Sequence, residues 1–347
     1  MKNIGRKTQQ NKITTPELIA QINPENQKLI KEFVSYLNCV DRSPKTIYQY
    51  EQDLNIFFVW NLQNNNNKFF VDITKKDIVR YQGYLIGENK NSPKRIRRLK
   101  AVLSSLSNYI ENILDDLYPN FRNIINKIES PTNEAVREKT VVDKEYVTNL
   151  LDKLVEQKQY QKACFLALAA FSGSRKSELL RFKASYFKPE YIVYGALYKT
   201  PEKIKTKGRG SSGKLLFRYT LVKDFDPYLK LWLEERKELG VESDWLFVTK
   251  KQEGWIQTKI STVDKWAESL TKQTGIPIYF HALRHFFTTE LSRNNIPDSV
   301  TQSIIGWASG DMVRLYNDLT IDDEIGKYFD EGGIKEGIKT GSISDLK

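Results

Sequence analysis

The sequence predicts a mostly helical α+β protein of two domains, and three features of its 347 residues support this prediction. The stretch from Pro24 to about Lys127 has helical periodicity and repeated helix-start signals. A polar, charged segment at residues 129–140 then interrupts that pattern. Beyond it, helical stretches alternate with short strand-like runs, which is typical of a mixed domain. A chain of this length also suits two domains of ordinary size.

The expected domain limits follow from the same features. Residues 1–22 are basic, polar and weakly periodic, so we expect a flexible tail or a small DNA-contacting arm. Residues 23–128 form the helical domain, and residues 129–140 form the linker. Residues 141–335 form the mixed domain, and residues 336–347 a loose C-terminal tail.

Helix-start signals divide the helical domain into a compact bundle of about four helices. Ser43-Pro44 and Ser92-Pro93 each place a serine N-cap before a proline at the first helical position. Thr74 and Asp77 have the spacing of a capping box, and a polar loop at residues 64–67 precedes them. The apolar faces of the first two helices include Leu29, Phe33, Val34, Leu37, Ile47, Tyr50, Leu54 and Phe57 or Phe58.

A cluster of basic residues follows the Ser92-Pro93 helix start directly. Its members are Lys94, Arg95, Arg97, Arg98 and Lys100. Their charges add to the positive end of the helix dipole, which favours phosphate groups. We therefore expect this cluster to bind DNA phosphates, with Lys45 beside the Ser43-Pro44 cap as a weaker contact.

The overall charge supports a nucleic-acid partner. The net charge is +11, and residues 1–130 carry 20 Lys+Arg against 13 Asp+Glu. Two cysteines and two histidines argue against a disulfide framework and a metal site. The first twenty residues lack the apolar region of a signal peptide, and the longest apolar run, Ala163–Phe171, is too short for a bilayer. We expect a soluble, cytoplasmic protein that needs no membrane and no cofactor.

The mixed domain is expected to combine helices with a few strands. Asp143 caps its first helix, and Ser172-Gly173-Ser174 ends its most apolar one. The expected helices cover residues 142–154, 161–171, 175–182, 226–239, 262–274, 283–293, 298–305 and 311–318. Strands are expected at residues 191–197, 215–221 and 245–248. A capping pattern at Thr320 and Asp323 predicts a short terminal helix that Gly332-Gly333 ends.

Four separated motifs carry residues suited to phosphodiester chemistry. They are SGSR ending at Arg175, HALRH with His281 and Arg284, the pair Gly306-Trp307, and Tyr316 nine residues after that tryptophan. Cleavage of DNA without a metal needs cations that stabilise charge on the phosphate, a proton donor for the leaving oxygen, and a nucleophile. Arginine supplies forked, permanently charged donors. A tyrosine nucleophile conserves the bond energy in a phosphotyrosyl ester.

These motifs, in this order and spacing, resemble the signature of the tyrosine recombinases, the family of phage integrases, Xer-type recombinases and transposon integrases. The resemblance covers residues 25 to 325 approximately. It implies an N-terminal SAM-like core-binding bundle and a mixed α/β catalytic domain that together clamp DNA. It also implies that Arg175 and Arg284 hold the scissile phosphate, that His281 assists proton movement or binds the phosphate, and that Tyr316 is the nucleophile. Glu178 would brace Arg175.

Two positions depart from the family pattern or leave it open. Trp307 occupies a position where the family has histidine or, less often, tryptophan, and an indole donates a hydrogen bond without shuttling a proton. The family also has a lysine on a β-hairpin, where this chain offers Lys205, Lys207 and Lys214. Lys207, directly before Gly208, fits best and Lys205 is the second candidate. We expect Lys205 and Arg209 also to contact DNA.

The resemblance implies a site-specific recombinase that acts on double-stranded DNA at a core site, without metal or ATP, as four copies on two duplexes in the prokaryotic nucleoid. Accessory proteins that set direction are a further class of partner. A telomere resolvase, a type IB topoisomerase and a catalytically inactive DNA-binding regulator are the alternatives that the same residues allow. The target sequence and the biological role stay open.

Overall fold

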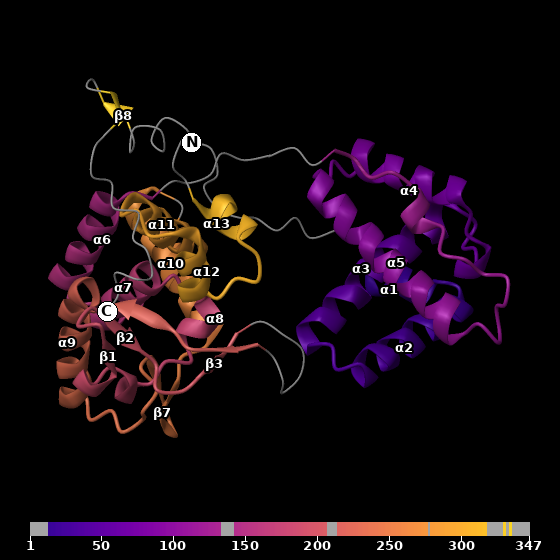
Figure 1. Ribbon diagram of the computed structural model, residues 1–347. Helices are drawn as coiled ribbons and strands as arrows, with labels where there is room; N and C mark the ends of the chain where they lie inside the picture. The colour runs from indigo at the N-terminus through magenta and orange to yellow at the C-terminus, as the bar shows by residue number, and fades with distance from the viewer. Residues whose placement is uncertain are drawn as a thin grey trace. The chain divides into compact units, whose positions relative to one another are not determined.

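The computed structural model describes residues 13–132, 142–206, 214–276, 278–317, 329–330 and 333–334 (Figure 1). Contacts along the chain separate two compact units. The described residues of the bundle unit are 13–132, and those of the mixed unit are the remaining ranges. The boundary falls inside the predicted linker, of which residues 133–140 lie outside the described residues. The predicted C-terminal tail also lies outside them. The helix predicted between Thr320 and Gly332-Gly333 lies mostly outside them, and where the structure describes that stretch, at Phe329–Asp330, the chain is a strand, so the prediction is wrong there.

The bundle unit is helical throughout its regular structure. Its helices are α1 (Pro16–Ala20), α2 (Pro24–Cys39), α3 (Pro44–Asn64), α4 (Lys75–Gly87) and α5 (Pro93–Ile113), with 3₁₀ turns at Phe70–Asp72 and Ile125–Lys127. The predicted caps form as expected. The Ser43 hydroxyl accepts a hydrogen bond from the Thr46 backbone N–H at 3.2 Å, and the Ser92 hydroxyl accepts one from the Arg95 N–H at 3.4 Å. Thr74 and Asp77 complete the predicted capping box.

The expectation of a loose tail through residue 22 is wrong for its last ten residues. Thr15 caps the short helix α1 through its side chain, and Pro16 occupies the first helical position. Ile22 is buried in the bundle core. This Thr-Pro start is the same signal that marks the later helices, but a single turn of helix shows too little periodicity to be read from sequence. Residues 1–12 of the predicted tail lie outside the described residues.

An aromatic core holds the bundle together. Phe33, Phe57, Phe58, Phe70 and Tyr81 are all buried, and the ring of Phe57 packs edge-on against those of Phe58, Phe70 and Tyr81. Such pairs add to the free energy gained from burying apolar surface. The helix faces predicted from periodicity therefore point into this core.

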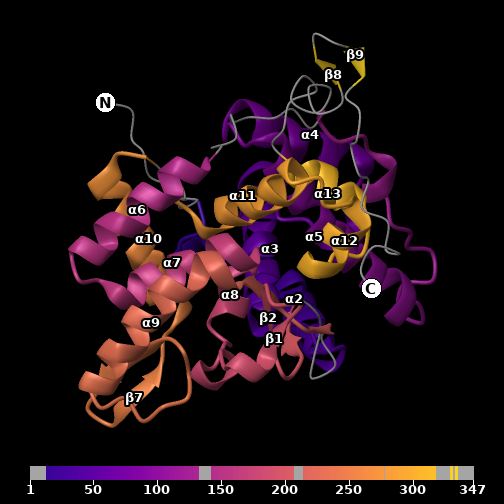
Figure 2. The same ribbon diagram turned by 60° about the vertical axis from the view of Figure 1, so that its left-hand side comes forward.

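The mixed unit is built around the apolar helix α7 (Tyr160–Ser172), whose residues from Ala163 onward are all buried. Figures 1 and 2 show α7 beside α6 (Lys144–Glu156), α9 (Val222–Glu238) and α11 (Phe280–Arg293). A helix that is apolar on every side has to be covered on every side. The other helices of this unit are α8 (Lys176–Leu179), α10 (Ile260–Thr274), α12 (Asp298–Ile305) and α13 (Asp311–Tyr316), with 3₁₀ turns at Ala184–Tyr186 and Pro189–Tyr191.

The strands are shorter than the sequence predicted. The run expected as one strand at residues 191–197 is a hairpin of β1 (Ile192–Val193) and β2 (Leu197–Lys199), because Tyr194 and Gly195 between them adopt positive φ angles. The run at residues 215–221 divides into β4 (Leu215–Leu216), paired with β3 (Ile204–Lys205), and β5 (Tyr219–Leu221), paired with β2. The strand expected at residues 245–248 begins at Val248.

That last strand, β6 (Val248–Lys251), pairs with β7 (Gly254–Gln257), a strand that was not predicted. A two-stranded pair, β8 (Phe329–Asp330) and β9 (Gly333–Ile334), lies near the C-terminus. None of the helices in the described ranges is both long and apolar enough to cross a bilayer.

The last three helices of the described residues, α11, α12 and α13, share a small apolar cluster. Phe287, Leu291, Ile305, Trp307 and Val313 make one apolar cluster, against which Tyr316 packs. In both ribbon views α13 lies beside α11 and α12. The turn between α12 and α13 depends on Gly306, whose φ is +77°. A side chain there would be strained, and its Cβ would approach Leu216 to 2.3 Å.

Candidate active site

Tyr316 ends helix α13 with its hydroxyl group against His281. The Tyr316 oxygen and His281 Nε2 are 2.7 Å apart, which is hydrogen-bond distance. The resemblance of the motifs to the tyrosine recombinase signature had implied that both residues belong to one site. His281 lies in the first turn of α11, three residues before Arg284, as predicted. The nucleophile candidate therefore has a potential proton acceptor in direct contact.

The side chains of three other residues hold the phenol of Tyr316. The ring of His285 stacks on it with centroids 4.3 Å apart and an interplanar angle of 21°, and that of Trp307 lies 4.8 Å away. The guanidinium carbon of Arg284 is 5.8 Å from the centre of the phenol ring. Both histidines of the chain thus contact one tyrosine. The sequence indicated that His285, one helical turn from His281, packs or hydrogen-bonds and does not catalyse, and its ring packs on Tyr316.

Arg284 is fully buried beneath this tyrosine. Its Nη1 donates a hydrogen bond to the Gly173 carbonyl at 2.7 Å, so it reaches the break after α7. Burial, and next the charge of Arg175, lower the pKa of Arg284 to about 9. Because this value is still above neutral pH, the guanidinium stays protonated there. Within the described residues, Arg284 Nε and Trp307 Nε1 are buried donors with no hydrogen-bond partner. Buried donors of this kind are costly unless an acceptor pairs with them.

Arg175 sits at the start of α8 and is held by Glu178. Its Nη1 donates to one carboxylate oxygen of Glu178 at 2.9 Å, and its backbone N–H donates to the other at 3.0 Å. Burial opposes ionisation of Glu178, but the charge of Arg218 and these hydrogen bonds outweigh it and lower its pKa. A third of the Arg175 side chain stays exposed. Glu178 thus orients an arginine that solvent can still reach.

The hairpin that carries the candidate lysines meets this site at the Gly306 turn. Lys214 Nζ donates a hydrogen bond to the Gly306 carbonyl at 3.1 Å. Lys205 lies on β3, where its own carbonyl accepts a hydrogen bond from Arg181. Lys207 and Arg209 lie outside the described residues. Lys214, the third candidate lysine, thus binds the turn that bears Trp307.

The basic cluster at the start of α5 is not uniform. Lys45, Lys94, Arg97 and Arg98 are exposed. Arg95 and Arg98 both pair with the buried carboxylate of Asp53, at 2.8 and 3.1 Å. Arg97 donates twice to the Pro131 carbonyl. Asp53 thus holds two arginines of the cluster in place, a role that the sequence did not indicate.

The prediction that Lys100 contacts DNA is wrong, because its side chain is buried in the bundle. Its ammonium group donates to Gln82 and to the carbonyls of Ile128 and Glu129. All three N–H donors of a lysine are then used inside the unit. Lys100 and Arg97 instead bind the backbone at residues 128–131, where the chain leaves the bundle.

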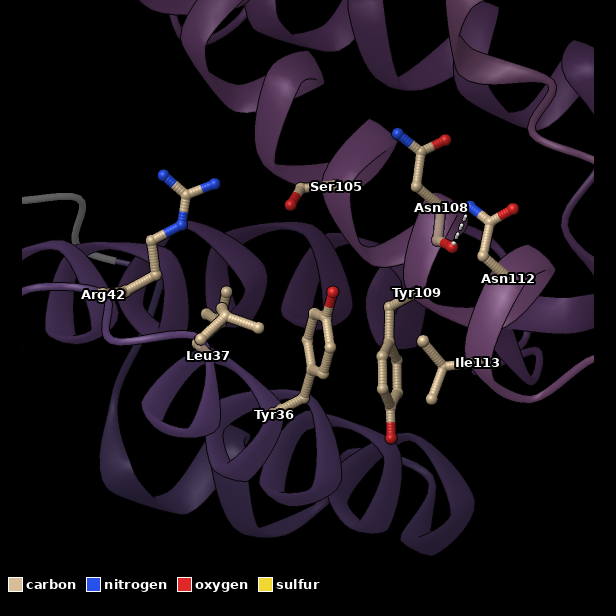
Figure 3. A pocket seen from close by; sticks show the side chains of 9 residues that line it. Tyr36, Leu37, Arg42, Ser105, Asn108, Tyr109, Asn112 and Ile113 are labelled. Atoms are coloured by element: carbon tan, nitrogen blue, oxygen red, sulfur yellow. Dashed lines mark hydrogen bonds between the residues drawn. The ribbon is translucent and has the colours of Figure 1, made fainter. Parts of the chain in front are cut away.

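The bundle unit also contains a pocket of about 180 Å³ between α2 and α5 (Figure 3). The rings of Tyr36 and Tyr109 stand next to each other in it, with centroids 5.0 Å apart. Asn112 donates a hydrogen bond to the Asn108 carbonyl at 2.8 Å on its wall. The residues that line this pocket do not include an acid, a base and a nucleophile together, so the Tyr316 site is the better candidate for the active site. Across the described ranges, no group of histidine, cysteine and carboxylate residues could hold a metal ion.

Comparison with known proteins gives a consistent result for both units. A model of the phage integrase family matches residues 140–322, and a model of the phage integrase N-terminal SAM-like domain matches residues 29–120. The chain is 32% identical over 239 residues to the SPbeta prophage-derived recombinase-like protein YomM of Bacillus subtilis, covering 68% of each chain. It is 24% identical to the tyrosine recombinase XerA of Pyrococcus horikoshii, covering 85% of this chain and 90% of that one.

A solved structure shares the fold. A lambda integrase dimer bound to a COC′ core site superimposes with a TM-score of 0.60 at 16% identity, covering 94% of this chain and 85% of that one. The bundle unit thus matches the expected SAM-like domain, and the mixed unit matches the expected mixed α/β domain.

Proposed function

The chain belongs to the phage integrase family and is a tyrosine recombinase. We therefore propose that it cuts and rejoins DNA at a specific core site, with Tyr316 as the nucleophile. The observation that carries the proposal is the contact between the Tyr316 hydroxyl and His281 Nε2, directly above the buried Arg284. A tyrosine whose proton has an acceptor and whose ring adjoins an arginine suits attack on a phosphodiester.

In the proposed cleavage step, the Tyr316 oxygen attacks the phosphorus and the 5′ oxygen of the next nucleotide leaves. The product is a 3′-phosphotyrosyl ester and a free 5′ hydroxyl. The phenolic proton passes to His281, and the leaving oxygen takes a proton from the hairpin lysine, for which we propose Lys207, with Lys205 as the alternative. Rejoining is the reverse reaction with a 5′ hydroxyl from the partner strand, so no external energy source is needed.

Arg175 and Arg284 are proposed to hold the non-bridging oxygens of the scissile phosphate. Charge builds on these oxygens during attack, and guanidinium groups match their geometry. Trp307 Nε1 and Arg284 Nε are buried donors without a partner among the described residues, and a phosphate oxygen would supply the acceptor. Trp307 donates a hydrogen bond but takes no part in proton transfer.

The assembly is proposed to be a tetramer on two DNA duplexes that exchanges strands in the prokaryotic nucleoid. One relative in fold is a lambda integrase tetramer bound to a Holliday junction. The bundle unit would be the core-binding domain and the mixed unit the catalytic domain, joined through the segment at residues 129–140. Accessory proteins would set the direction of the reaction.

A nicked suicide substrate tests the proposed function. DNA from the sequences that flank the gene of this chain would carry a nick just 3′ of the cleavage position. The short fragment that bears the free 5′ hydroxyl is then lost, and rejoining stops. We expect a covalent protein–DNA adduct that survives denaturation and disappears after proteolysis. Binding of this DNA with no adduct would instead identify a DNA-binding protein without catalysis.

The exposed basic residues of α5 are expected to bind DNA phosphates through the bundle unit. Replacing Lys94 and Arg98 together by glutamine should weaken DNA binding and reduce the slope of log K against log salt by about 0.9 for each phosphate that the protein no longer neutralises. Fluorescence anisotropy at several salt concentrations measures this. The control is Lys28→Gln, because Lys28 is an exposed lysine on α2, outside the basic cluster of α5. An unchanged slope in the double variant would show that this face does not touch DNA.

A further inference from the structure

Arg218 is a buried arginine that lies outside the four sequence motifs. It lies between β4 and β5, and its backbone N–H donates to the Thr200 hydroxyl at 3.0 Å while its carbonyl accepts from the Thr200 N–H at 3.0 Å. Its side chain is only 1% exposed. An arginine is seldom buried to this degree unless its charge is paired. Both terminal nitrogens of Arg218 have partners, while its Nε has no hydrogen-bond partner among the described residues.

The side chain of Arg218 contacts the supports of both site arginines. Its Nη2 forms an ion pair with Glu178, the residue that holds Arg175. Its Nη1 donates to the Ile305 carbonyl at 2.8 Å, and Arg284 Nη2 lies 3.5 Å from that same oxygen. Arg218 therefore links the start of α8 to the end of α12, although it is too deeply buried to reach DNA itself.

The same residue stabilises the turn that leads to Trp307. A Cβ atom placed on Gly306 would be 3.4 Å from Arg218 Nη1, so the turn packs closely on the guanidinium. Leu216 on β4 touches the same glycine, and Lys214 donates to its carbonyl. The chain from Lys214 to Arg218 thus forms the support on which the Gly306 turn lies.

Arg218 also neutralises the charge of Glu178, which affects Arg175. Glu178 carries one negative charge, and the side chains of Arg175 and Arg218 both pair with it. If Arg218 were absent, Glu178 would have Arg175 as its remaining cationic partner. A carboxylate balanced by that arginine alone would compete with the scissile phosphate for its charge.

We propose that Arg218 is a positioning residue for strand cleavage: it neutralises Glu178 so that Arg175 stays available for the phosphate, and it holds the Ile305 carbonyl beside Arg284. This inference rests on the proposed function, since it concerns how that site is kept ready. It assigns no contact with DNA to Arg218. Its removal should slow the chemical step and leave DNA binding unchanged.

The test compares Arg218→Gln with the unmodified chain on the nicked substrate, at saturating protein and in a single turnover. We expect adduct formation to slow on the order of 100-fold, as for a site whose groups are displaced by about 1 Å, with the same affinity for the DNA. Arg218→Lys keeps the charge but not the forked geometry, so its rate should fall between the two. If the glutamine variant fails to fold, the cleavage rate of Arg218→Lys still tests the proposal.

Arg236→Gln is the matched control. Arg236 is also a buried arginine of the mixed unit, but its guanidinium donates to the carbonyls of Ser243, Trp245 and Leu246, away from the site residues. We expect this variant to lose thermal stability and to keep its cleavage rate. Equal slowing of both variants at an equal loss of Tm would overturn the proposal, because general destabilisation would then explain the effect.

A double variant tests the charge argument directly. Glu178→Gln added to Arg218→Gln removes the carboxylate that would otherwise compete for Arg175. We expect it to regain about tenfold in rate over Arg218→Gln alone, in line with the coupling between members of one charge network. A double variant no faster than the single one, when Glu178→Gln alone cleaves at the normal rate, would refute the neutralisation of Glu178. If the unmodified chain itself forms no adduct, the proposed function fails, and this inference fails with it.

Discussion

Tyr316→Phe is expected to abolish covalent attachment to DNA while leaving DNA affinity unchanged. The variant removes only the hydroxyl, so the ring can keep its packing against His285 and Trp307. Without the oxygen no ester to phosphorus can form, and adduct formation should fall by more than about a thousandfold. Denaturing gels with the nicked substrate measure the adduct, and anisotropy measures the affinity.

Tyr194→Phe is a suitable control for this experiment. Tyr194 is 84% exposed in the turn between β1 and β2 and has no part in the site. Its variant should form adduct at the normal rate. An adduct that persists at full yield in Tyr316→Phe would mean that another of the 18 tyrosines is the nucleophile, and peptide mapping of the adduct would identify it.

Arg284→Lys should produce the second-largest loss, although the substitution retains the positive charge. Lysine offers one ammonium group where Arg284 both binds the Gly173 carbonyl and carries a second, unpaired N–H. A single ammonium nitrogen cannot reproduce the planar fork by which separate guanidinium nitrogens reach acceptors at different positions, so we expect it to lose either the backbone contact or the phosphate contact. We expect cleavage to slow by about 10²- to 10³-fold, the range seen when one donor to a developing negative charge is removed.

Single-turnover cleavage at saturating protein separates this effect from binding. Arg293→Lys is the control, because Arg293 lies on the same helix with its side chain 45% exposed and paired with Glu290. That variant should cleave normally. A cleavage rate for Arg284→Lys close to that of the unmodified chain would mean that the buried guanidinium serves the fold and not the reaction.

The sequence predicted those parts of the fold that local chemistry determines. The helix starts at Ser43-Pro44, Ser92-Pro93 and Thr74 were readable because the cap and the residues that it binds are neighbours in the chain. The grouping of His281, Arg284, Trp307 and Tyr316 was implied by the resemblance of their motifs to the tyrosine recombinase signature. The strands were predicted poorly, since runs of two to four residues give almost no periodicity.

Contacts between distant residues that lie outside the recognised motifs were not predicted. The sequence suggests that Lys100 binds phosphate, but its burial arises from carbonyls 28 and 29 residues later in the chain. Arg218 pairs with Glu178, which lies 40 residues earlier, and with Ile305, which lies 87 residues later. The one signal available was a lone arginine within the apolar run LLFRYTL. A charged residue with apolar neighbours on both sides, in a strand that is buried on both faces, needs a partner elsewhere in the chain.

The hydroxyl of Tyr316 contacts a histidine of its own polypeptide. This contact bears on whether the tyrosine of one subunit acts in its own active site or in that of a neighbouring subunit. If the reacting geometry resembles this arrangement, each subunit cuts with its own complete set of groups. Mixing Tyr316→Phe chains with Arg284→Lys chains should then restore no cleavage, because every subunit in the mixture lacks one essential group. Recovery of activity on mixing would instead show that the tyrosine is donated from one subunit to its neighbour.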